Sequence, residues 1–184
     1  MNTELISLMD EISSLPPAQV LEKLKNASST VKLDPDWLFL VACYQVDNQE
    51  LSEAKKSFFS LLDSNPDNEV ARLQLACVHL SLGEFKHILY LLCPYLVWQI
   101  APTCISSIAH ALINFVQNDK KKMNSYLNEA KAFEEASELK SIIDVLSRFF
   151  VDAAASMGTV ADNEEELKHD TRSHLLSNLY SKKY

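Results

Sequence analysis

Apolar residues recur at helical spacing along most of the chain. Near the amino terminus, residues 3–13 form a short amphipathic helix by their pattern, with apolar residues at helical spacing: Leu5, Ile6, Leu8, Met9 and Ile12. A second helix is expected from Pro16-Pro17 to about Lys25, because proline suits the first turn of a helix. The pattern therefore predicts two amphipathic helices before the centre of the chain.

The central part of the chain repeats itself after 34 residues. This shift places Val41-Ala42-Cys43 on Leu75-Ala76-Cys77. Gly83 lies at the turn between the two predicted helices of the second copy. Glycine accepts the positive φ of a sharp reversal. Asn48 and Asn118 stand near the equivalent turns, and asparagine is the next most tolerant residue there. Each copy is therefore predicted to be a helical hairpin.

A third copy follows with a shift of 35 residues, which places Ala111 on Ala76 and Asn114 on His79. A period of about 34 residues with small residues at fixed points resembles the tetratricopeptide (TPR) repeat. The resemblance implies an all-α fold of antiparallel helix pairs, stacked as a short right-handed array with N-terminal helices and a C-terminal capping helix. The expected units are N-terminal helices (1–33), repeats (34–66, 67–101, 102–136), a capping helix (137–157) and a tail (158–184).

The capping helix is predicted from a single apolar stripe, which would cover the face that the last repeat otherwise leaves in water. The stripe consists of Leu139, Ile142, Ile143, Leu146, Phe149 and Phe150.

The formal net charge of −8 excludes nonspecific binding to nucleic acid, which needs a cationic face. The cysteines lie inside apolar patterns without metal-like spacing, so we expect buried, reduced thiols. Residues 1–15 lack the basic start and apolar run of a secretion signal. These features favour a cytoplasmic protein. The cysteines are Cys43, Cys77, Cys93 and Cys104.

Residues 88–118 contain no Asp, Glu, Lys or Arg, and a run of this length could in principle span a bilayer. However, Pro94 and Pro102 interrupt it, together with several polar residues. We therefore expect buried helices and no membrane insertion.

The sequence holds no pattern typical of a catalytic, cofactor or metal site. Two distant glycines exclude a phosphate-binding loop, and the histidines form no HExxH motif. We expect His79 and His110 to be hydrogen-bonded interior residues, and His87 to pair with Glu84 on a helix surface. The prediction is a protein without enzymatic activity or cofactor.

In TPR proteins the first helix of each repeat forms the inner wall of a groove. Transferred to this chain, that register gives a wall that is overwhelmingly apolar. Such a wall exceeds what a monomer usually exposes, so a partner segment, a second copy or the chain's own terminal helices should cover it. The predicted partner-binding residues are Phe39, Leu40, Cys43, Val46, Leu73, Cys77, Leu80, Ile108, Leu112 and Phe115.

The layout also resembles the small TPR chaperones of bacterial type III secretion, which hold apolar segments of secreted subunits. The main hypothesis is therefore a scaffold or chaperone that binds an apolar peptide or helix of another protein. The alternative is a structural subunit of a stable homo- or hetero-oligomer, homodimer included, that uses the uncharged 88–118 region as its interface. In that case Tyr95, Trp98 and Ile100 would be interface residues.

Overall fold

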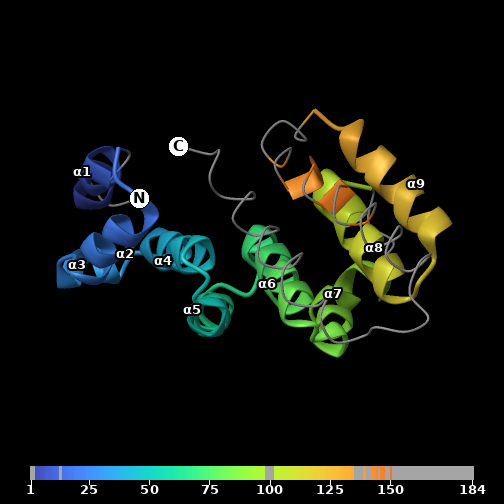
Figure 1. Cartoon of the computed structure of the whole chain (residues 1–184), viewed down its shortest axis with the longest axis horizontal. Helices are drawn as coiled ribbons and strands as arrows, with labels where there is room; N and C mark the ends of the chain where they lie inside the picture. Colours follow the sequence, from blue (N-terminus) through green and yellow to red (C-terminus); the bar gives the residue numbers. More distant parts are fainter. Residues whose placement is uncertain are drawn as a thin grey trace, which may run out of the picture.

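A computed structural model describes residues 3–12, 14–97 and 102–134, together with residues 139, 142–144, 146, 147 and 150. All regular secondary structure in this part of the chain is helical, and consecutive helices pack against one another across the molecule (Figure 1). The predicted all-α class is confirmed. The helices are α1 (Thr3–Ile12), α2 (Pro17–Lys25), α3 (Ser29–Lys32), α4 (Pro35–Asp47), α5 (Leu51–Ser64), α6 (Glu69–Leu82), α7 (Phe85–Val97), α8 (Cys104–Val116) and α9 (Lys120–Lys131).

Helices α2 and α3 pack on α4, and α1 joins them around a small core. Pro17 occupies the first turn of α2, as expected. The joint predicted after residue 25 contains the short helix α3, which the sequence analysis missed. Its N-cap is Ser28, whose hydroxyl accepts a hydrogen bond from Val31 N and donates one to Glu4. This core contains Leu5, Ile12, Val20, Leu21, Leu24, Val31, Leu40 and Val41.

The remaining helices form three successive hairpins: α4 with α5, α6 with α7, and α8 with α9. Each hairpin also contacts the next, since α5 packs on α6 and α7 packs on α8. The leading helices of the second and third hairpins, α6 and α8, touch directly as well. The helices thus pack sequentially, and the hairpin boundaries fall where the repeat pattern predicts turns.

The three hairpins share one turn conformation. Gln49, Gly83 and Asn118 all have positive φ, of 63°, 72° and 60°, and they follow one another at intervals of 34 and 35 residues. After each of them, a backbone N–H reaches back to the carbonyl five residues earlier in the chain, as in a Schellman motif. These bonds are Glu50 N to Gln45 O (2.8 Å), Glu84 N to His79 O (2.9 Å) and Asp119 N to Asn114 O (2.9 Å).

The positive φ of Gly83 and of Asn118 agrees with the expectation for these turns. The expectation for the first turn was one residue early, because Asn48 has φ −86° and ends α4. Gln49 takes the left-handed conformation instead. Glutamine has a Cβ, so this left-handed conformation is strained, whereas glycine adopts it without strain.

The main core runs through all three hairpins and continues into the carboxy-terminal stripe. Leu139, Ile142, Ile143, Leu146 and Phe150 are helical and buried in it, and their role as a cap stays a prediction. Phe149, the rest of the predicted capping helix and the 158–184 tail lie outside the described residues.

The described helices include none that is both long and apolar enough to cross a membrane. Cys43, Cys77 and Cys104 are buried, as predicted, whereas Cys93 is exposed. The expectation for Cys93 was wrong because this residue lies on the outer side of α7, away from the core.

Candidate functional site

The residues predicted to line a groove lie mostly in the core. Leu40 belongs to the small core near the amino terminus. The other seven buried positions belong to the main core. In this conformation they offer no surface to a partner, and a partner-binding role for them stays a prediction that requires the helices to separate. The seven are Cys43, Val46, Leu73, Cys77, Leu80, Ile108 and Leu112.

The two remaining residues of that set, Phe39 and Phe115, are half-buried and packed against the main core. Phe39 meets the edge of Phe58 with ring centroids 6.1 Å apart. Phe115 stacks on Phe150, 4.7 Å away, so the carboxy-terminal stripe covers this side of α8. In the described part of the chain, its own helices cover the predicted apolar wall, which was one of the three expected ways of covering it.

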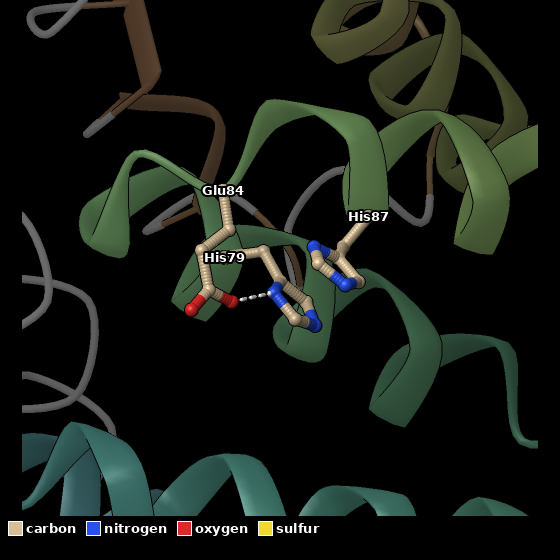
Figure 2. A group of neighbouring side chains, drawn as sticks. All are labelled: His79, Glu84 and His87. Carbon is tan, nitrogen blue, oxygen red and sulfur yellow. Dashed lines mark hydrogen bonds and ion pairs between the residues drawn. The ribbon is translucent and has the colours of Figure 1, made fainter.

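A polar cluster lies at the turn between α6 and α7. His79 is in the last turn of α6, Glu84 follows Gly83, and His87 is in the first turn of α7 (Figure 2). Atoms of these three side chains that could bind a metal lie within 4.8 Å of one another. The left-handed turn at Gly83 brings them together, because it reverses the chain between the two helices.

Glu84 is the centre of this cluster. One of its carboxylate oxygens, Oε2, lies 2.6 Å from His79 Nδ1, and Lys55 on α5 donates to Oε1 and Oε2 at 2.9 and 3.1 Å. The expected pair between Glu84 and His87 is not among these contacts. His87 stacks on His79 instead, with ring centroids 4.8 Å apart and planes 7° apart.

His79 is 1% exposed, and Phe59 of α5 meets its ring edge-on at 5.9 Å. Burial lowers the pKa of His79 and outweighs the hydrogen bond to Glu84, which raises it. Burial alone would raise the pKa of Glu84, but the hydrogen bonds from Lys55 and His79 bring it below its usual value. At neutral pH a neutral imidazole therefore donates its Nδ1 proton to a carboxylate.

This tautomer leaves the lone pair of His79 on Nε2. That atom is shielded from solvent and has no hydrogen-bond partner within the described part of the chain. The expectation that His79 is a hydrogen-bonded interior residue is confirmed at one nitrogen only. His110 is half-buried and stacks on Tyr126 at 4.8 Å.

The sequence predicted a pair of Glu84 with His87 but did not connect His79 to it, so the cluster of three was missed. The available signal was the turn itself, since His79 lies in the last turn of one helix and His87 in the first turn of the next. The other turns carry different chemistry at the equivalent positions. Gln45 and Asn114 correspond to His79, and both are buried.

A second feature of this region is the outer side of α7. Phe85, Tyr90 and Leu96 are exposed by 41%, 77% and 51%. Together with Leu89 and Cys93 they occupy an arc of about 140° on the helix, at 100° per residue. We call this set of five residues the α7 face.

A cavity of about 110 Å³ lies between α7, α8 and α9. Ser107 and His110 line it, and Ser107 Oγ has no hydrogen-bond partner within the described residues.

Comparison of the chain with known protein families, curated proteins and solved structures found no match.

Proposed function

We propose that the chain is a protein–protein interaction module of the TPR type, and that it docks on another protein through the α7 face. The TPR assignment is supported by three hairpins whose turns recur at 34 and 35 residues with the same backbone hydrogen bonds. The docking assignment rests on one observation, the gathering of exposed apolar side chains on the outer side of α7.

The α7 face differs from scattered surface hydrophobics, which are normal on any protein. Three of the six large apolar side chains that are exposed in the described residues lie on this one helix. Its sequence continues into the uncharged 88–118 region. Burying such side chains against a partner contributes roughly 1.5–3 kcal/mol for each fully covered residue.

The occupant that we propose is an apolar helix or extended segment of a different protein. A second copy of this chain would bring another formal charge of −8 with it, and like net charges oppose association. A neutral or basic partner meets no such repulsion. The proposal thus keeps the predicted scaffold or chaperone role in the cytoplasm but moves the binding surface from the inner wall to the α7 face.

The test compares Tyr90→Asp with Leu33→Asp. Both replace an exposed apolar side chain, 77% and 83% exposed, but Leu33 lies before α4, away from the α7 face. Each variant is expressed in the protein's own cells and recovered at low salt, and the proteins that accompany it are identified. We expect a specific companion to be lost with Tyr90→Asp and retained with Leu33→Asp.

Retention of that companion by Tyr90→Asp would contradict the docking surface. Sedimentation of the purified chain tests the oligomeric alternative. If the chain is a dimer and Tyr90→Asp makes it a monomer, the α7 face binds a second copy and not a different protein. Leu73→Asp would not test a binding surface, because Leu73 is fully buried and the substitution would act on folding.

A further inference from the structure

We propose that His79 and His87 bind a divalent transition-metal ion of the zinc class, with Glu84 holding His79 in the ligating tautomer. This inference is independent of the proposed docking on the α7 face, because none of the three residues belongs to that set.

The first support is the state of His79. A histidine that binds a metal usually donates its other ring N–H to a carboxylate, which fixes the tautomer and makes the ring a better ligand. His79 already has this arrangement, since Nδ1 lies 2.6 Å from Glu84 Oε2. The second nitrogen, Nε2, is shielded from solvent and has no partner within the described residues. A lone pair in that position is what a cation requires.

The second support is the position of His87. Its ring stacks on His79 at 4.8 Å, and it comes from the neighbouring helix (Figure 2). Two imidazoles are ligands that suit zinc, copper and nickel, and Zn²⁺–N distances are about 2.0–2.1 Å. Because a bound metal lies in the plane of each ring, the exposed His87 must rotate out of the stack. Water completes the coordination.

Access to Nε2 is compatible with its burial. The rings that pack against His79 are Phe59 and His87, and both belong to exposed residues. Rotation of such surface side chains takes picoseconds to nanoseconds. Both rings that contact His79 can therefore move aside.

Lys55 opposes the ion. Its ammonium group lies 2.9 Å from Glu84 Oε1 and adds a positive charge beside the proposed site. Removing that charge should strengthen binding of a divalent cation by about tenfold, as expected for a charge of +2 and a charge of +1 about 6 Å apart in a solvent-like dielectric. An increase in metal affinity on removal of Lys55 is diagnostic, because a purely structural role of the cluster predicts no such increase.

The experiment titrates ZnCl₂ into the metal-free full chain by calorimetry, with imidazole ¹⁵N NMR to follow the histidines. The variants are His87→Ala, Lys55→Ala and, as a matched control, His110→Ala. Circular dichroism verifies that each remains folded. We expect His87→Ala to weaken binding by at least about tenfold, since even removal of an outer-shell partner costs about 10–100-fold. Lys55→Ala should bind more tightly, and His110→Ala should match the parent chain.

Binding that is equal in the parent and in His87→Ala would overturn the proposal, as would an equal loss in His87→Ala and His110→Ala. An unchanged or weaker affinity of Lys55→Ala would place the ion away from Glu84 and overturn it too. A shift of the His79 Nε2 resonance on addition of zinc supports it directly. None of these results depends on a protein partner, so they leave the proposed docking function untouched.

Discussion

The turn between α4 and α5 and the turn between α6 and α7 have the same backbone but opposite side-chain chemistry. In the first, a glutamine takes the left-handed conformation and the half-buried Asp47 has a carboxylate oxygen without a partner in the described residues. In the second, Gly83 takes that conformation without strain, and Ser81, the equivalent of Asp47, donates its hydroxyl to Cys77 O at 3.1 Å.

The difference shows that the hairpin does not need the histidine cluster. Gln45 occupies the place of His79 and accepts a hydrogen bond from Ser57 at 2.7 Å, and the first turn still forms. The two histidines at the second turn are therefore additions to a backbone that forms without them, since Gln45 and Glu53 stand at their positions in the first hairpin. This is why we assign them a ligand and not only a structural role.

The largest effect is expected for Asp47→Asn. Burial raises the pKa of Asp47 to about 7, so the folded state disfavours the charged carboxylate. A raised pKa favours the folded state below the unfolded pKa of about 3.9, and that contribution is lost as the pH rises through 7. At pH 8 the cost is up to about 4 kcal/mol, or roughly 2 kcal/mol where water reaches the group.

Asp47→Asn should thus stabilise the protein at pH 8 and have little effect at pH 4. Denaturant unfolding at both pH values measures this, with the exposed Asp63→Asn as the control. An equal effect of Asp47→Asn at the two pH values would show that the carboxyl titrates normally.

Next in size is Gly83→Ala. At φ 72° a Cβ clashes with the backbone, so we expect a loss of about 1–2 kcal/mol in the free energy of unfolding. Thermal and chemical unfolding give the value. An unchanged free energy of unfolding would mean that the second turn tolerates a Cβ at its positive-φ position as well as the first turn does.

Gln49→Gly is the converse substitution. It removes the left-handed strain but adds freedom to the unfolded chain, which leaves a net gain of about 0.5–1 kcal/mol. The same unfolding measurement applies, and the double variant with Gly83→Ala should show additive effects because the two turns are distant. A loss of stability would indicate that the glutamine side chain contributes contacts worth more than the strain.

The smallest effect is expected for Lys55→Ala, which removes the ion pair between α5 and Glu84. Both side chains are about one-third exposed, so the loss should be about 0.5 kcal/mol and should shrink as salt is added. The matched control is Lys56→Ala, whose pair with Glu53 is far more exposed and should contribute almost nothing. Equal effects in the two variants would contradict a special environment at the second turn.

Much of the fold could be predicted from the sequence, because each hairpin is determined by residues that are close together along the chain. Proline at residue 17, the glycine at 83 and the apolar spacing identify the helices and their turns. The short α3 was missed because four residues are too few to show a period. The left-handed residue of the first turn was misplaced because asparagine is a better candidate than glutamine by propensity alone.

The surfaces were harder to predict than the helices. Periodicity shows which side of a helix is apolar, but not which neighbour covers it. The inner residues such as Leu73 and Ile108 proved to be buried by the chain itself, while Cys93 and Tyr90 remained outside. The stacking of His79 on His87 depends on how the turn aims two side chains, which spacing along the chain does not specify.

Helix α4 contributes residues to both cores, and the two cores share no residue. It gives Leu40 and Val41 to the amino-terminal cluster, and Ala42, Cys43 and Val46 to the main one. Detachment of α1–α3 would wet only one side of α4 and leave the three hairpins intact. The amino-terminal helices therefore cover the apolar side of α4 that faces away from the main core, at the first hairpin of the series.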